Sequence, residues 1–333
     1  MPPTRRAAGR AFVLMIALGL AAGCTPAPAP APEPVTTPAL VATEVSPTPS
    51  PTPSPTPTPT PTPTDPLPAG PINALFLGSD TRDATGYGTG DRSDVIVLAH
   101  ITAARDKLYL ISVARDTYAQ IPGVGGTKVN AAYSKGGPKL ATETISTMFG
   151  GAKISYTAEM SFNSFTDFVG VLDGITVNNQ YASTVGSNSY PKGKITLTKA
   201  NALDYVRQRH GLPNGDLDRA ERHRAAITGI LARLAELSDD PAKLASVMPA
   251  LLKDMRVTGD FDLQTALSLV PLAKNLGSGD VVSLMVPIKN FGMVNGASVN
   301  MINTTKMDAL TKALSADTLD QYVAKYGTSY KVG

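Results

Sequence analysis

The chain has 333 residues, a formal net charge of +3, 28 prolines and a single cysteine. Twenty of the prolines lie at or before Pro71, so a proline-rich leader precedes a body, residues 72–333, of ordinary composition. One cysteine excludes a disulfide framework and any metal site built from several thiolates. The net charge is too small to indicate nucleic-acid binding by itself, so any electropositive site must be local.

Residues 1–23 have the pattern of a bacterial lipoprotein signal peptide. Arginines precede an apolar run at residues 11–20, and small residues follow it. That run is too short to cross a bilayer, which takes about 20 apolar residues. Cys24 comes directly after Ala-Ala-Gly, which predicts that it is lipidated and becomes the mature N-terminus. The alternative is ordinary signal cleavage that leaves a free thiol.

Residues 24–71 predict a disordered stalk. Proline alternates with threonine or serine without interruption from Pro47 to Thr64. Proline at every second position removes backbone donors and fixes φ, so neither helix nor sheet can form and polyproline II is favoured. Such a stalk would hold the rest of the chain away from the membrane, within the cell wall.

The body alternates between strand and helix patterns. β-rich apolar runs predict strands at residues 72–77, 94–101, 107–113, 154–160, 175–177 and 281–286, the second and third forming a hairpin. Apolar residues at helical spacing predict helices at 138–149, 162–172, 202–206 and 227–234. The expected class is α/β (α+β), a central mixed sheet flanked by helices. We expect residues 72–237 to form the main domain and 238–333 an α/β extension that packs on it or completes it.

Three loops hold an unusual share of the charge. The first runs from Gly78 to Asp94, and the second is Arg115-Asp116, directly after the third predicted strand. The third spans residues 205–224 and contains five arginines and three acids. Any one pair, such as Arg92 with Asp94, is well explained as a surface ion pair that contributes ~0–1 kcal/mol.

Arg207 and Arg209 fit the surface-pair explanation less well. At 100° per residue they point about 200° apart on a helix, so they converge only if the helix ends near Val206 and the chain becomes extended. Arginine rather than lysine at all five positions of this segment favours bidentate binding of phosphate oxygens. Among these arginines, Asp80 and Asp94 can hold a hard cation such as Mg²⁺ that bridges phosphates.

Other chemistries fit worse. The sequence has no phosphate-binding Gly-x-x-x-x-Gly-Lys-Ser/Thr loop, no dinucleotide-binding glycine motif after a strand, and no Gly-x-Ser-x-Gly elbow. The three histidines lack metal-ligand spacing. Interleaved basic and aromatic residues are absent, so no nucleic-acid partner is expected.

Several short blocks occur in a fixed order between residues 72 and 235. They include Asn73–Arg82, Arg92–Val95, Ala114–Tyr118, Lys128–Tyr133, Tyr205–His210 and Gly215–Arg219. In this order they resemble the LytR–CpsA–Psr family of bacterial cell-envelope proteins. The chain departs from that pattern at His223 and Arg224, where the family usually has glutamines, and at Ala114, where it usually has proline.

The resemblance implies a phosphotransferase outside the membrane. Such an enzyme moves a glycopolymer from a polyprenyl-pyrophosphate carrier to a peptidoglycan hydroxyl and forms a phosphodiester. The implied fold has an apolar tunnel for the prenyl chain between the sheet and its helices. The implied partners are the carrier, the peptidoglycan acceptor and, through the lipid anchor, the extracytoplasmic face of the membrane.

The resemblance also implies roles for individual residues. By matching position, Asp80 and Asp94 would bind Mg²⁺, with Asp216 and Arg222 in support. The arginines that would grip the pyrophosphate are Arg92, Arg115, Arg207, Arg209 and Arg219, and the catalytic set would be Arg115, Arg92 and Asp94. The alternative is an exported protein that binds the lipid pyrophosphate, or an envelope-regulatory protein, without turnover; two metal-binding carboxylates favour the enzyme.

Overall fold

The computed structural model describes residues 67–80, 92–253, 255–277 and 279–328. The predicted signal peptide, Cys24 and most of the stalk lie outside these residues, so their assignments stay predictions. Among the described residues, no helix is both long enough and apolar enough to cross a membrane.

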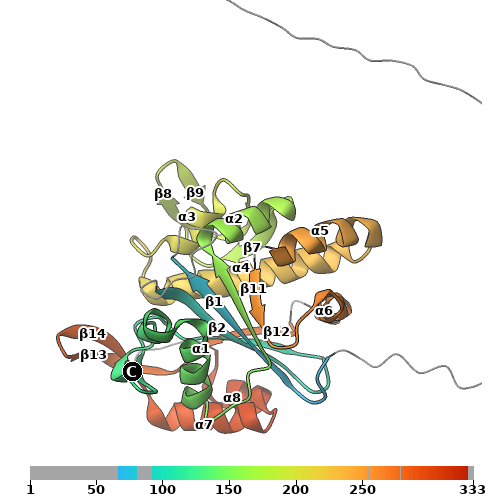
Figure 1. Cartoon of the computed structure of the whole chain (residues 1–333). Coiled ribbons are helices and arrows are strands. Elements are labelled where there is room, and N and C mark those ends of the chain that lie inside the picture. Colours follow the sequence, from blue (N-terminus) through green and yellow to red (C-terminus); the bar gives the residue numbers. More distant parts are fainter. Residues whose placement is uncertain (1–66, 81–91, 254, 278, 329–333) are drawn as a thin grey trace, which may run out of the picture. The chain divides into compact units, whose positions relative to one another are not determined.

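A six-stranded mixed sheet forms the centre of the body (Figure 1). Its strands, in spatial order, are β11 (Met255–Thr258), β6 (Tyr156–Ser161), β1 (Ile72–Ser79), β2 (Ser93–Ile101), β3 (Leu108–Ser112) and β12 (Val281–Met285). β1 is parallel to β6 and β3 is parallel to β12, whereas the other neighbouring pairs are antiparallel. Both edge strands, β11 and β12, therefore come from the part of the chain after residue 237.

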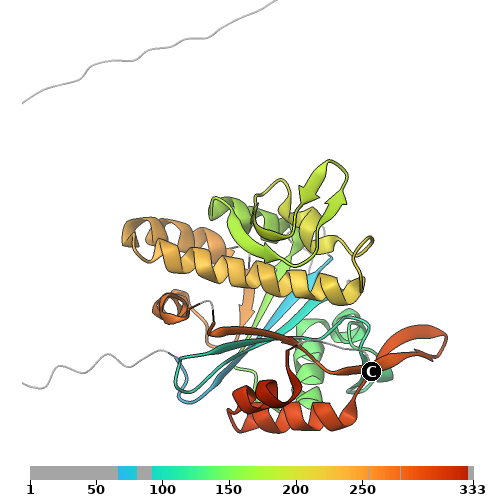
Figure 2. The ribbon, with the colours of Figure 1, turned by 180° about the vertical axis from the view of Figure 1, so that it is seen from behind.

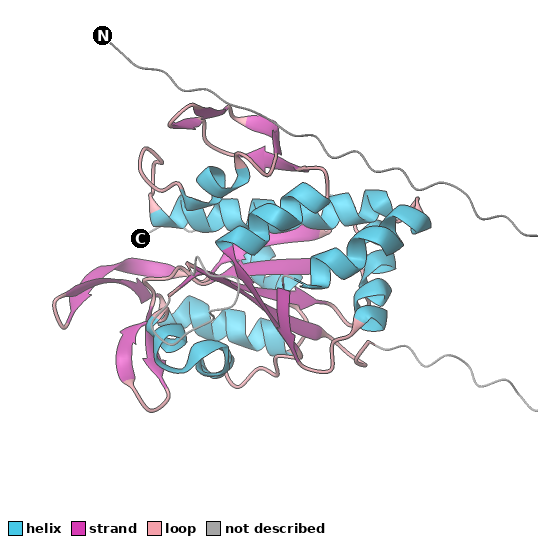
Figure 3. Ribbon diagram, turned by 45° about the horizontal axis from the view of Figure 1, so that its top comes forward, coloured by secondary structure: helices cyan, strands magenta, loops and turns pink. Residues whose placement is uncertain are grey.

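Four two-stranded ribbons extend from this framework. They are β4 (Tyr118–Ile121) with β5 (Gly125–Lys128), β7 (Ile175–Asn179) with β10 (Gly193–Leu197), β8 (Ser183–Val185) with β9 (Asn188–Tyr190), and β13 (Ile288–Val294) with β14 (Ala297–Ile302). Figure 3, coloured by secondary structure, shows strands outside the central sheet as well as within it. β7 packs against α4, and Ile175, Val177 and Leu197 of its ribbon are buried.

Helices cover both faces of the sheet. On one face lie α1 (Ala131–Met148), α7 (Thr304–Ser315) and α8 (Leu319–Tyr326). The helices on the other side are α2 (Phe162–Val171), α3 (Ala202–Arg207), α4 (Asp216–Leu237), α5 (Pro241–Lys253) and α6 (Leu263–Asn275). Figure 2 shows α4, the longest helix, running across this second face.

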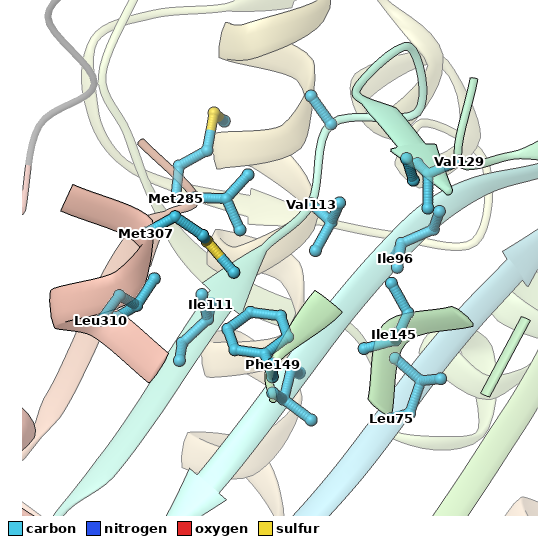
Figure 4. Close-up of a cluster of buried hydrophobic side chains, with 14 of the residues drawn as sticks. Leu75, Ile96, Ile111, Val113, Val129, Ile145, Phe149, Met285, Met307 and Leu310 are labelled. Atoms are coloured by element: carbon cyan, nitrogen blue, oxygen red, sulfur yellow. The ribbon is translucent and has the colours of Figure 1, made fainter. Parts of the chain in front are cut away.

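The face under α1 and α7 is a closed hydrophobic core (Figure 4). Alternate residues of the strands point into it, and Leu75, Ile111 and Phe149 are fully buried there. Burying a large apolar side chain contributes about 1.5–3 kcal/mol relative to exposure, so this core is a main source of the fold's stability.

The predicted fold class and most of the predicted elements are confirmed. Strands form at all six predicted places, with each end within two residues of the prediction. The helix expected at 138–149 begins earlier, at Ala131, and is kinked at Gly136 and Gly137, which have non-helical dihedral angles. β11 and the ribbon strands other than β7 were not predicted.

Candidate active site

A β-bulge lies where β1 ends and β2 begins. Gly78 pairs with Val95 and Ser79 pairs with Ser93, so Asp94 is the extra residue between two paired positions. A bulge re-aims the side chain of its extra residue. A Cβ at residue 78 would lie 2.6 Å from a Val95 side-chain carbon, so only glycine fits beside this bulge.

Asp94 is held between two arginines. Its Oδ1 accepts a hydrogen bond from Arg115 Nη1, in the loop after β3, and its Oδ2 lies 3.3 Å from Arg219 Nη1, on α4. The chain of contacts continues, because Asp216 Oδ1 lies 3.5 Å from Arg219 Nη2 and 3.9 Å from Arg209 Nη1. We call these five residues the arginine–aspartate network.

The network is buried at one end and open at the other. The side chains of Arg219 and Asp94 are only 7% and 12% exposed, whereas that of Arg209 is 50% exposed. Burial raises the pKa of Asp94 above its ordinary value, Arg219 and Arg115 lower it, and Asp80 and Asp216 raise it further. Asp80 is therefore within electrostatic reach of Asp94.

Asp80 and Asp94 form a donor set that suits a hard cation. Asp80 is exposed at the end of β1, where its Oδ1 accepts a hydrogen bond of 2.9 Å from the backbone N–H of Arg92. Each Asp94 oxygen that faces an arginine keeps a second lone pair for a metal ion. No group of three or more potential protein ligands occurs among the described residues, so a Mg²⁺ ion here would take its other ligands from phosphate and water.

The loop after β3 adds a lysine that the sequence analysis did not assign. Asp116 Oδ1 lies 3.0 Å from Lys128 Nζ and 3.6 Å from Arg115 Nε. Lys128 therefore adds positive charge beside Arg115. In the sequence, the only indication of this position is that Lys128 begins one of the blocks that resemble the family, Lys128–Tyr133.

The segment with Arg207 and Arg209 ends a helix, as expected, but one residue later than Val206. Gln208 is extended, with φ −65° and ψ 129°, so Arg209 leaves the helix and reaches Asp216. Arg207 is exposed, and its guanidinium lies 5.2 Å from the centre of the Phe162 ring. The structure thus brings Arg209 into the network and sets Arg207 on Phe162, a residue that the sequence analysis did not single out. Arg92 contacts Asp80 through its backbone, because its N–H donates to Asp80 Oδ1 and its carbonyl accepts a hydrogen bond of 3.2 Å from the Asp80 N–H.

Arg222 lies behind the network rather than in it. This buried side chain donates to Gln208 Oε1 at 2.7 Å and to Ser183 Oγ at 2.6 Å, and it stacks 4.4 Å from the centre of the Tyr205 ring. Because Gln208 stands between Arg207 and Arg209, Arg222 supports the turn that presents both.

An apolar cavity of about 260 Å³ opens beside these charges, between the sheet and α2, α4, α5 and α6. Its lining includes Phe76, Tyr156, Ile227, Leu231 and Phe261. Gly78 and Val95, at the bulge, and Phe162, beneath Arg207, also line it. The apolar space therefore meets the charged residues at one end of β1 and β2.

His223 lines the same cavity and is uncharged at neutral pH. Burial, with the charges of Arg219 and Arg224, lowers its pKa from 6.5 to about 3. Its Nε2 donates a hydrogen bond of 2.9 Å to the Val206 carbonyl, which joins α4 to the end of α3.

Comparison with known proteins agrees with these motifs. The model of the LytR_cpsA_psr family matches residues 50–316, most of the chain. The chain belongs to this family. A relative from Oceanobacillus iheyensis, named polyisoprenyl-teichoic acid–peptidoglycan teichoic acid transferase TagU, is 34% identical over 211 residues. That match covers 61% of this family member and 64% of the relative, which is less than two thirds of the relative's length.

Solved structures of similar proteins show the same fold. The crystal structure of TagV from B. subtilis superposes with a TM-score of 0.67 at 22% identity, over 76% of this LytR–CpsA–Psr chain and 98% of TagV. A structure of TagT bound to LIIa-WTA gives a TM-score of 0.60 at 25% identity, over 75% of this chain and 91% of that one.

Proposed function

We propose that this family member is a phosphotransferase that moves a glycopolymer from a polyprenyl-pyrophosphate carrier to a hydroxyl of peptidoglycan. The observation that carries the proposal is the meeting of an apolar cavity with the arginine–aspartate network at one end of the sheet. A prenyl pyrophosphate has the same two parts, an apolar chain and an anionic head. The names of the curated relatives, teichoic acid transferases, point to the same chemistry.

The cavity would hold the prenyl chain and the arginines its pyrophosphate. The lining consists of apolar side chains. Moving a prenyl chain from water into it is favourable by about 25 cal/mol per Å² of apolar surface buried. This space supports the apolar tunnel that the family resemblance implies, and the tunnel stays a proposal.

At the head, Arg115, Arg219 and Arg209 would pair with phosphate oxygens. These arginines already face carboxylates, so an incoming pyrophosphate exchanges one anionic partner for another and no buried arginine is left without one. Arg207, exposed over Phe162, and Arg92, beside Asp80, would close the site from the solvent side.

Asp80 and Asp94 would hold Mg²⁺, which when bound neutralises charge on the transferred phosphoryl group. Phosphoryl transfer depends on positioning and charge stabilisation more than on covalent help from a side chain. That requirement explains why arginines and carboxylates are enough here, without a nucleophilic triad. The same two carboxylates favour turnover over mere binding of the lipid pyrophosphate.

Lipidation of Cys24 would tether the enzyme to the extracytoplasmic face of the membrane, where the carrier lies. The proline-rich stalk would let the body reach the wall. Intact-mass analysis of membrane-extracted protein should find a diacylglyceryl-modified Cys24 at the mature N-terminus, and an unmodified thiol there would contradict the anchor.

A transfer assay tests the proposed function. The full chain in detergent is incubated with a polyprenyl-pyrophosphate-linked oligosaccharide, Mg²⁺ and peptidoglycan, and two products are measured. We expect polyprenyl phosphate together with acid-labile, phosphodiester-linked sugar on the peptidoglycan. Stable donor binding without either product would instead support the binding protein.

A further inference from the structure

The β13–β14 ribbon carries the two most exposed large hydrophobic side chains of the described residues. Phe291 is 57% exposed and Met293 is 68% exposed. The two lie at alternate positions of β13, so both point to one face of the ribbon. Ser298, the cross-strand partner of Met293, shares that face.

The ribbon that carries this face is joined to the loop that carries Arg115. The backbone N–H of Asn300, on β14, donates a hydrogen bond of 2.8 Å to the Asp116 carbonyl, and Asn300 forms a β-bridge with Thr117. β4 follows directly, and its hairpin with β5 exposes Val124 near the turn. We call the exposed residues Val124, Lys289, Phe291, Met293 and Ser298 of these two hairpins the hairpin surface.

The hairpin surface has little charge. Residues 118–128 and 288–302 contain one lysine each, Lys128 and Lys289, and no acidic residue. Membrane surfaces attract segments with several clustered lysines and arginines. Two lysines, of which Lys128 is already paired with Asp116, fit that role poorly.

The hairpin surface and the cavity lie at different edges of the sheet. β13 follows β12, which is one edge strand, whereas the cavity is lined from β11, β6, β1 and β2 towards the other edge. Figure 1 shows β13 and β14 projecting from the body on the side away from α5 and α6. In an in-line phosphoryl transfer the attacking and leaving oxygens lie on opposite sides of the phosphorus. A donor with its prenyl chain in the cavity would therefore be open to an acceptor on the side of its phosphorus away from the cavity, where the β13–β14 ribbon lies.

We propose that the hairpin surface binds the acceptor, a glycan strand of peptidoglycan. Pyranose rings present an apolar face of C–H groups that packs on aromatic and thioether side chains such as Phe291 and Met293. Their hydroxyl and amide groups suit Ser298, and stem-peptide carboxylates suit Lys289. This inference rests on the proposed function and names where its second substrate lies.

The test measures binding of the full chain, in detergent, to purified peptidoglycan sacculi freed of attached glycopolymer. The double variant Phe291→Ala/Met293→Ala should raise the apparent Kd about tenfold, the usual effect of removing exposed anchor side chains. The matched control is Val171→Ala/Leu263→Ala, on α2 and α6, whose side chains are 37% and 41% exposed. The control should bind like the wild type. In the transfer assay the double variant should raise KM for the acceptor and leave KM for the donor unchanged.

Three results would overturn the hairpin surface as an acceptor site. The double variant binds sacculi like the wild type; it loses binding to phosphatidylglycerol vesicles and not to sacculi; or it turns a dimer of this chain into a monomer. Binding to sacculi that depends on Phe291 and Met293 supports the hairpin surface even if no polyprenyl phosphate is released. The binding test and the transfer assay can therefore fail independently of each other.

Discussion

The two faces of the central sheet come from the same strands and are filled differently. Under α1, α7 and α8, side chains such as Phe149 and Ile111 are fully buried in a closed core. Under α2, α4, α5 and α6, Phe76 and Ile227 stay half-buried around a cavity of about 260 Å³. Unfilled apolar space costs roughly 24 cal/mol per Å³, so a cavity of this size is a cost of several kcal/mol. The difference supports the proposal that one face serves stability and the other binds the prenyl chain.

The largest expected effect is on the closed face. Phe149→Ala should lower the free energy of unfolding by ~3–5 kcal/mol, because it removes a fully buried ring from a core with no room to collapse. Phe76→Ala, at the cavity wall, should cost less than half as much, since its ring already lacks packing partners on one side. Urea unfolding of both variants measures the two costs. Equal losses would contradict the contrast between the faces.

The second-largest effect is expected on the catalytic rate, at the arginine–aspartate network beside the cavity. Arg115→Ala should lower kcat by ~10²–10³, because in the proposed function it removes a donor aimed at the developing phosphate charge. Arg115→Lys should recover only part of the rate, since an ammonium cannot make a bidentate contact. Turnover is measured as release of polyprenyl phosphate, alongside circular dichroism to verify folding.

The matched control for Arg115→Ala is Lys199→Ala. Lys199 forms an exposed ion pair with Asp167, 2.6 Å away, and such pairs contribute little to stability. The control should keep the wild-type rate. An Arg115→Ala protein that is folded and fully active would mean that the arginine–aspartate network is structural.

Enlarging a buried alanine should destabilise the closed face and not the face with the cavity. Ala141 lies in the closed core and Ala158 lines the cavity. Ala141→Leu should destabilise the fold by ~1–3 kcal/mol through overpacking, whereas Ala158→Leu has room and should leave stability unchanged or raised. Ala158→Leu should instead raise KM for the prenyl donor. Thermal melts and donor titrations measure the two effects, and equal destabilisation by both variants would argue against the cavity.

The long apolar elements of the fold were predictable and the short exposed ones were not. β1, β2 and β3 are continuous β-rich apolar runs that report burial directly. β11 alternates Met255 and Val257 with polar residues, but four residues are too few to predict a strand. In β13 the buried Ile288 is followed by two exposed polar residues, Lys289 and Asn290, which interrupt the apolar pattern. The edge and ribbon strands form because other segments pair with them, and the pairing partner of a strand cannot be predicted from its own residues.

In the site, charge was predictable and partnership was not. Asp94, Arg115 and Arg219 are charged residues within the short blocks that resemble the family, so the sequence was enough to predict them as site residues. The bulge that aims Asp94 depends on the register between β1 and β2, which no local pattern encodes. Phe162 under Arg207 looks like any apolar residue in sequence, and its role comes from the meeting of α2 with α3.

The smallest effect at neutral pH concerns His223, which joins the cavity wall to the end of α3. Because its pKa falls from 6.5 to about 3 on folding, the unfolded chain binds a proton below pH 6.5 that the folded chain does not. Stability that is complete above pH 6.5 is therefore lost as the pH falls towards 3, at no more than about 1.4 kcal/mol per pH unit. In His223→Gln the amide can still donate to the Val206 carbonyl but does not titrate, so this part of the acid sensitivity should vanish with the pH 7 stability nearly unchanged. Urea midpoints between pH 7 and 4.5 measure the difference, and parallel curves for the two proteins would mean that His223 is protonated in the folded state.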